Sequence, residues 1–194
     1  MVQDLTPLLA VAAALAWPAA APATPLTYRL DPAHTFATFE VRHFDTSTIR
    51  GRIGPVTGDV TLDRAAGTGD VRLEIPVATV STGSRVFDAR LREPDLLSTD
   101  ANPVAWFVAT RFRLAAVDGA VQEVRGEFTF RGTSAPLSLT ATRFACRDDA
   151  RLRRQVCGGD FEASFDRSAF GATFGLPFIG NRVHLLVQVE GIAD

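Results

Sequence analysis

The stretch VSTGSRVFDARLREPDLLSTDANPVAWF, residues 80–107, is the longest segment after residue 23 that lacks the alternation of a β-strand. Ser84 can cap a first helical turn through its side-chain oxygen, and Pro94 ends the run. Between them, Phe87 and Leu91 are four positions apart and share one helical face. Because the flanking sequence reads as strands, this stretch predicts one helical insertion in a β protein.

Strand patterns on both sides of the insertion set the fold class. Period-two alternation of apolar residues predicts strands near residues 26–30, 35–43, 49–53, 56–62, 71–75, 104–114, 124–130, 137–144, 161–165 and 183–189. Asp118-Gly119 is a hairpin signal between two of them. The regular spacing favours an all-β fold, an extended antiparallel barrel of about eight strands, over a βαβ protein.

Phenylalanine dominates the apolar faces of these strands, since 14 of the 17 aromatic residues are Phe. A barrel of about eight strands is either filled by such side chains or holds one small apolar ligand, and the pattern leaves both interpretations open. The residues expected to line the interior are Phe39, Val41, His43, Phe107, Phe128, Phe130, Phe165 and Val187.

The insertion also carries three arginines, Arg85, Arg90 and Arg92. An insertion between two strands must leave a barrel at one of its ends, so we expect residues 84–97 at the barrel mouth. Because a guanidinium binds phosphate through a bidentate fork, Arg85 and Arg90 are candidates for contact with a ligand head group. The alternative is that all three arginines are simply solvated.

Residues 1–23 are expected to be a secretory signal peptide. The apolar run LLAVAAALAW, residues 8–17, is too short to span a bilayer, and Ala21-Pro22-Ala23 is a small-x-small cleavage site. A buried or surface helix is the alternative. Residues 24–194 are then a single domain exported to the periplasm.

Cys146 and Cys157 are eleven positions apart and flank the polar segment RDDARLRRQV between two strand-like runs. In an exported protein this arrangement favours a disulfide across a long hairpin. Two free core cysteines or half a metal site are the alternatives.

Composition and motifs restrict the chemistry. A formal net charge of −2 provides no basic excess for nucleic acid, although all 20 positive residues are arginine. His34 and His43 are nine apart and face opposite sides of a regular strand, and the sequence contains no HExxH or GxSxG motif. We therefore expect no catalytic residues, no metal site and no cofactor.

A series of short elements follows one another along the chain in a specific order and spacing. They are Tyr28, Leu30, Asp31, His34-Thr35, Phe39, Val41 and His43; Gly51, Gly58 and Leu62-Asp63; Ser81-Thr82-Gly83, Asp88, Leu91, Pro94-Asp95 and Pro103; Gly126, Gly132 and Pro136; Arg167-Ser168, Phe170-Gly171, Pro177, Ile179-Gly180 and Val183. In these elements the chain resembles the YceI-like polyisoprenoid-binding proteins, a periplasmic family with a lipocalin-like barrel. The chain departs from the family pattern at Phe87, Arg90, Leu96-Leu97 and Arg131.

The resemblance implies a non-enzymatic carrier or storage protein that encloses a long isoprenoid chain, of the polyprenyl phosphate or quinone type. The implied partners are that lipid, the inner membrane or a membrane redox protein in transient contact, and a second copy of the chain. Two other functions stay open: an enzyme, hydrolase or isomerase, acting on an amphiphilic lipid in the same barrel, and a packed envelope stress protein without a ligand.

Overall fold

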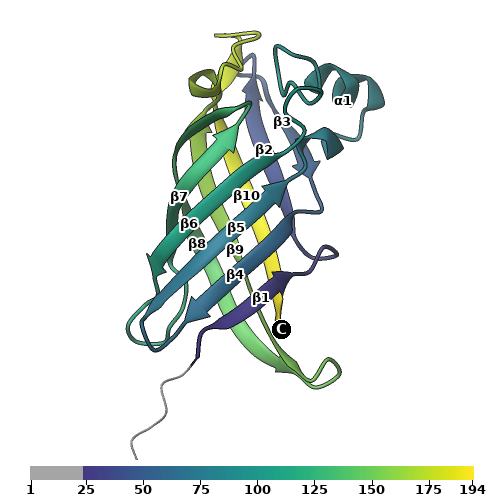
Figure 1. Ribbon diagram of the computed structural model, residues 1–194. Helices are drawn as coiled ribbons and strands as arrows, with labels where there is room; N and C mark the ends of the chain where they lie inside the picture. Colours follow the sequence, from purple (N-terminus) through teal and green to yellow (C-terminus); the bar gives the residue numbers. More distant parts are fainter. Residues whose placement is uncertain (1–23) are drawn as a thin grey trace, which may run out of the picture.

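The computed structural model describes residues 24–194, so the predicted signal peptide at residues 1–23 lies outside the described residues. One antiparallel sheet dominates these residues (Figure 1). Its strands are β1 (Leu26–Leu30), β2 (Phe36–His43), β3 (Ser47–Ile53), β4 (Thr57–Asp63), β5 (Thr68–Ile75), β6 (Ala105–Arg113), β7 (Glu123–Phe130), β8 (Thr133–Asp149), β9 (Arg154–Asp166) and β10 (Ile179–Ala193). The helical elements are η1 (Val77–Thr79), α1 (Arg85–Leu91) and η2 (Arg167–Phe170).

Strand β10 closes the sheet into a barrel. The strand order runs β1-β4-β5-β6-β7-β8-β9-β10-β2-β3, and β1 pairs back onto β10. Strand β2 pairs with the first part of β10 and β1 with its last residues, so β1 and β2 follow one another along the same edge. The ring from β1 and β4 through β10 therefore has eight strands, which confirms the predicted antiparallel barrel.

The side chain of Thr35 bridges the step between β1 and β2. Its hydroxyl donates to the carbonyl of Glu190 in β10 at 3.1 Å and accepts from the Glu190 amide at 3.2 Å. Asp31 also donates its amide to the Glu190 carbonyl. Thr35 is fully buried, so its hydroxyl supplies bonds that the backbone ladder lacks where the partner strand changes.

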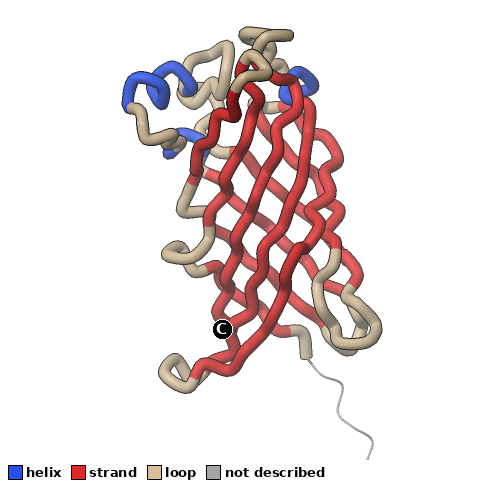
Figure 2. The backbone as a smooth tube through the Cα atoms, turned by 180° about the vertical axis from the view of Figure 1, so that it is seen from behind, coloured by secondary structure: helices blue, strands red, loops and turns tan. Residues whose placement is uncertain are grey.

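The helical insertion forms as the sequence predicts and lies at one end of the barrel, with the loop between η2 and β10 beside it (Figures 1 and 2). The Ser84 side chain accepts a hydrogen bond from the amide of Phe87 and caps α1. The Asp88 carboxylate accepts bonds from the amide and the hydroxyl of Thr82, which fixes α1 to the segment before it. Across residues 24–194, we find no helix with the length and apolar character needed to cross a bilayer.

The strands β8 and β9 are longer than predicted. They continue through the polar segment, which turns only at residues 150–153, and they form the long hairpin at the opposite end of the barrel (Figure 1). Cys146 and Cys157 are directly paired across these strands and form a disulfide, which confirms that prediction.

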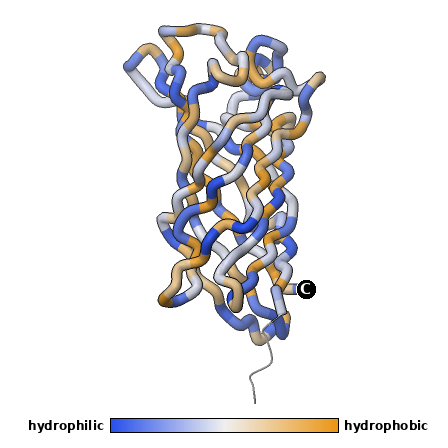
Figure 3. The backbone as a smooth tube through the Cα atoms, turned by 60° about the vertical axis from the view of Figure 1, so that its left-hand side comes forward, coloured by the Kyte–Doolittle hydropathy of each residue, from blue (hydrophilic) through white to orange (hydrophobic). Residues whose placement is uncertain are grey.

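Apolar and polar residues alternate along the strands, as Figure 3 shows by colour. The inward positions form one buried core from Tyr28 and Leu30 at one end to Phe130 and Phe170 at the other. This alternation is the pattern that made the barrel predictable.

Candidate ligand-binding site

An apolar cavity of about 170 Å³ occupies the half of the barrel nearest α1; we call it the upper cavity. Strands β2, β3 and β5–β10 line it, and α1 with the η2–β10 loop closes its end. Seven residues predicted to line the interior do so: Phe39, Val41, Phe107, Phe128, Phe130, Phe165 and Val187. Their contact with a ligand remains a prediction.

Four phenylalanines form a continuous aromatic wall, and three of them, Phe128, Phe130 and Phe165, line the upper cavity. The rings of Phe128, Phe130, Phe165 and Phe170 lie with centroids 5.3–6.2 Å apart, in stacked, tilted and edge-on pairs. Such pairs stabilise one another beyond the area they bury. The interior therefore contains both a packed aromatic wall and free apolar space.

The mouth of the upper cavity is formed by α1 and the loop before β10. Phe87 and Leu91 share one face of α1, as their spacing predicted, and both line the cavity, where Leu96 and Leu97 extend the apolar surface. Phe174 also lines the cavity and is 44% exposed, so this side chain lies between the cavity and the surface.

Arg90 lies at the mouth, but its charge is already compensated. Its guanidinium donates to both carboxylate oxygens of Asp95 at 2.7 Å and to Glu93 at 2.7 Å. It also lies over the ring of Phe174, 4.1 Å from the centroid. The hydrogen bonds between Arg90 and Asp95 raise the pKa of the Arg90 guanidinium and lower the pKa of the Asp95 carboxyl.

Two predicted site residues are not among those that line the upper cavity. His43 follows Val41 on the same face of β2, beyond the cavity, and its ring packs edge-on against Phe44. Arg85 is exposed at the start of α1. Arg92, the third arginine of the insertion, donates to the backbone carbonyls of Ala78 and Val80 and so has a structural role.

Comparison with known proteins agrees with this architecture. Residues 28–191 match the family described as the YceI-like domain. The chain belongs to the YceI-like family. Protein YceI of Shigella flexneri is 27% identical over 168 residues, which cover 85% of this chain and 86% of that protein.

Solved structures share the fold of this YceI-like chain. BcnA of Burkholderia cenocepacia superposes with a TM-score of 0.64 at 18% identity and covers 83% of this chain and 98% of its own. A Saccharophagus degradans domain, described as polyisoprenoid-binding and implicated in plant cell wall breakdown, gives a TM-score of 0.60 at 20% identity, with coverage of 87% and 99%. At this level of identity the likeness shows the barrel fold.

The positions at which the sequence is expected to depart from the family pattern gather around the mouth. Phe87, Arg90, Leu96 and Leu97 line the upper cavity. Arg131 donates to the carbonyls of Pro94, Leu96, Phe170 and Gly171, and thereby ties the insertion to the turn after η2.

Arg167 was not predicted as a site residue, yet it lines the cavity and is 5% exposed. Its guanidinium donates to the carbonyls of Gly180, Ala172 and Ile179 at 2.6–2.9 Å. Burial lowers the pKa of this guanidinium. The arginine therefore fixes the η2–β10 loop that forms part of the mouth, a role that no short-range sequence signal indicates.

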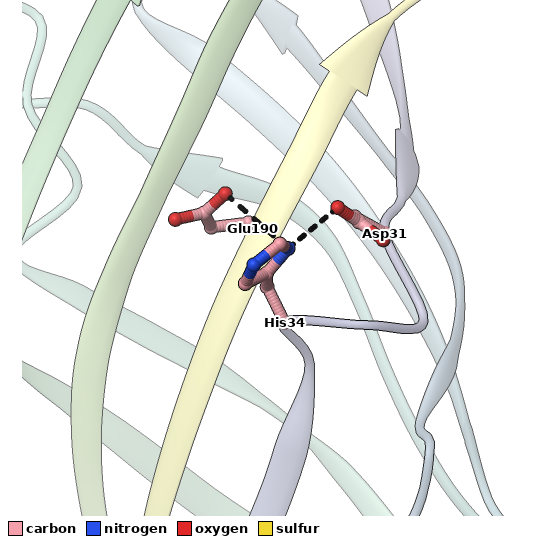
Figure 4. A group of neighbouring side chains, drawn as sticks. All are labelled: Asp31, His34 and Glu190. Atoms are coloured by element: carbon pink, nitrogen blue, oxygen red, sulfur yellow. Dashed lines mark hydrogen bonds and ion pairs between the residues drawn. The ribbon is translucent and has the colours of Figure 1, made fainter.

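Asp31, His34 and Glu190 form a polar group on the outside of the barrel (Figure 4). His34 Nδ1 lies 2.7 Å from Asp31 Oδ2 and 4.0 Å from Glu190 Oε2. The hydrogen bond between His34 and Asp31 lowers the pKa of the Asp31 carboxyl and raises the pKa of the His34 ring. The nearest side-chain atoms of the three residues lie within 4.8 Å of one another, a spacing that could hold a cation. His34 is exposed and the two acids are half-buried, and none of the three lines the upper cavity.

Proposed function

We propose that this YceI-like protein binds an isoprenoid lipid inside its barrel, as a carrier or storage protein of the bacterial periplasm. The observation that carries the proposal is the upper cavity, whose lining residues are all apolar except Arg90 and Arg167. Each buried CH₂ group contributes about 0.8 kcal/mol, so an isoprenoid tail of several units anchors itself without polar contacts. A wall of this kind offers no arrangement of acid, base and nucleophile for an enzyme of the second interpretation.

The head group of such a lipid would lie at the mouth, beside Arg90 and Phe174. Polar groups at a mouth decide which head group an apolar site accepts. The compensated charge of Arg90 is compatible with a neutral quinone or alcohol, whereas a polyprenyl phosphate would compete with Asp95 and Glu93 for the guanidinium.

Exposed aromatic residues at the same end support a transient contact with the inner membrane. Phe44 and Phe178 are 55% and 63% exposed and stack on each other with centroids 5.7 Å apart. Aromatic side chains are favoured at the interface between membrane and water. Phe174 lies in the same loop as Phe178, lines the cavity and is partly exposed to solvent. Docking of this end of the barrel on the membrane would therefore bring the mouth of the cavity to the lipid.

The periplasmic location is supported by the predicted signal peptide and by the disulfide, which persists in oxidising compartments. A quinone-type ligand would in addition imply exchange with a membrane redox protein. The periplasmic location and the exchange with a membrane redox protein are both parts of the proposal.

Native mass spectrometry of protein purified from the periplasm, followed by lipid extraction, tests the function. We expect the wild type to carry an isoprenoid lipid. Val183→Phe, which fills the upper cavity from β10, should remove that lipid. Val108→Phe is the matched control, because Val108 is 37% exposed and does not line the cavity. A folded wild-type protein without any isoprenoid, and unable to take one up, would overturn the proposal.

A further inference from the structure

The barrel interior contains a second apolar cavity of about 70 Å³, the lower cavity, in the half that ends at the disulfide. Its lining includes Tyr28, Leu62, Phe112 and Phe161. The upper and lower cavities share three lining residues, Leu73, Phe107 and Leu139. These three side chains, from β5, β6 and β8, separate the two cavities.

Phe107 is the largest of the three and is 1% exposed. Its register partners are Leu73 in β5 and Phe128 in β7. The ring lies against β7 at Gly126, where a Cβ atom would come within 2.7 Å of the Phe107 Cζ atom. The Phe107 ring therefore occupies space that a side chain at position 126 would fill, and from this position it lies between the two cavities.

The upper cavity is small, so the division at Phe107 limits how much of a ligand it can hold. Ligand sites commonly measure about 300–1,000 Å³, and 170 Å³ is well below this range. A tail that enters at the mouth and fills the upper cavity would end against Phe107. The next apolar space on its path, among the residues that the structure describes, is the lower cavity.

We infer that Phe107 determines the length of the isoprenoid tail that this barrel holds. This inference rests on the proposed function and adds a specificity-determining residue to it. Units of the tail that fit above the Phe107 ring are buried and strengthen binding, whereas units beyond it stay outside the barrel and add little.

The test compares the affinities of prenyl alcohols of two, three, four, six and eight isoprene units for the full-length exported protein. For the wild type we expect affinity to rise with length and then to reach a plateau. Phe107→Leu opens the connection between the cavities, so the plateau should move to longer alcohols. The longest alcohol should then bind at least about tenfold more tightly than it binds the wild type, since each further buried CH₂ group adds affinity.

Phe112→Leu is the matched control, because Phe112 lines only the lower cavity and is 7% exposed. It enlarges the interior beyond Phe107 without opening the connection, so its plateau should stay at the wild-type length. Phe107→Met serves as a second variant if Phe107→Leu is poorly folded. A wild-type affinity that rises without a break up to eight units overturns the inference even without a variant.

The outcomes also separate this inference from the function on which it rests. Binding with the same plateau in wild type and both Phe107 variants would overturn the role of Phe107 and leave the lipid-binding function standing. Failure of every alcohol to bind any of the folded proteins would overturn the proposed function and this inference together.

Discussion

Gly51 in β3 lies directly opposite Phe39 in β2, and the Phe39 ring covers the place where a side chain at position 51 would begin. A Cβ atom at Gly51 would clash with the Cε1 and Cζ atoms of that ring. Gly69 and Phe112 repeat the arrangement between β5 and β6, with a Cβ 2.5 Å from the ring. Rings that lie on glycines of the next strand stay close to the barrel wall, so these glycines help to keep the interior open.

Substitution of Gly51 tests this arrangement. Gly51→Ala should force the Phe39 ring toward the upper cavity and destabilise the protein by about 1–3 kcal/mol, as overpacking in a core does. Urea unfolding measures the change in free energy of unfolding. The displaced ring should also weaken binding of a prenyl alcohol, because it occupies space that the ligand needs.

The effect should depend on the ring and not on the alanine itself. In a Phe39→Leu background, Gly51→Ala should cost much less, which a double-mutant cycle reports as a coupling between the two positions. An equal loss of stability in both backgrounds would show that the contact with Phe39 is not the cause.

Much of the fold was predictable because its signals are local. Ser84, Phe87 and Leu91 specify α1 within about two helical turns of sequence, and Cys146 and Cys157 are close enough in sequence to indicate their pairing. The alternation of Phe128 and Phe130 likewise indicated which face of β7 points into the barrel. Each of these features needs only neighbours along the chain or across one hairpin.

The features that were missed depend on longer contacts or on solvent. The outer ends of β8 and β9, residues 147–149 and 154–155, are polar, so no apolar alternation marks a strand there. Arg167 is buried where the chain folds back over it, and it binds the carbonyls of Ala172 in the η2–β10 loop and of Ile179 and Gly180 at the start of β10. Nor does periodicity distinguish Phe107, which separates two cavities, from Phe128, which lines one.

Arg167 should be required for an ordered mouth. Arg167→Lys keeps a positive charge but cannot reach the three carbonyls of Gly180, Ala172 and Ile179 at once. We expect a loss of about 1–3 kcal/mol in the free energy of unfolding, since buried carbonyls lose their partners. Arg182→Lys is the control, because the Arg182 side chain is 69% exposed. Equal stability of the two variants would contradict the structural role of Arg167.

The pair of Asp31 and His34 should make stability depend on pH. The hydrogen bond to Asp31, with the charges of Asp31 and Glu190, raises the pKa of His34 above its ordinary value of 6.5, while Arg147 acts in the opposite direction. A raised folded-state pKa means that the stabilisation is complete below pH 6.5 and is lost as the pH rises through the folded-state pKa.

An NMR titration of the His34 ring measures this effect. Asp31→Asn should lower the pKa of His34 strongly, and Glu190→Gln should lower it less, since that carboxylate is 4.0 Å away. Urea midpoints of wild type and Asp31→Asn should differ most below pH 6.5 and converge at higher pH. A His34 pKa that is the same in all three proteins would refute this assignment.

The compensated charge of Arg90 leads to a prediction about the head group. Asp95 and Glu93 both engage the Arg90 guanidinium, so a diphosphate that approaches Arg90 must displace these two carboxylates. We expect the wild type to bind a prenyl alcohol more tightly than the diphosphate of the same chain. Asp95→Asn frees part of the guanidinium fork and should strengthen diphosphate binding by roughly tenfold, in line with about 1.5–3 kcal/mol for a hydrogen bond to a charged group. Affinity for the alcohol should change little, because the tail still provides the anchor.

Two further variants control for the charge. Asp100→Asn is the control for general charge, because Asp100 is an exposed acid in the same segment between α1 and β6 as Asp95. Arg90→Gln in the Asp95→Asn background should abolish the gain in diphosphate binding. If Asp95→Asn and Asp100→Asn strengthen diphosphate binding equally, the charge of the whole mouth decides the preference and Arg90 has no specific role in it.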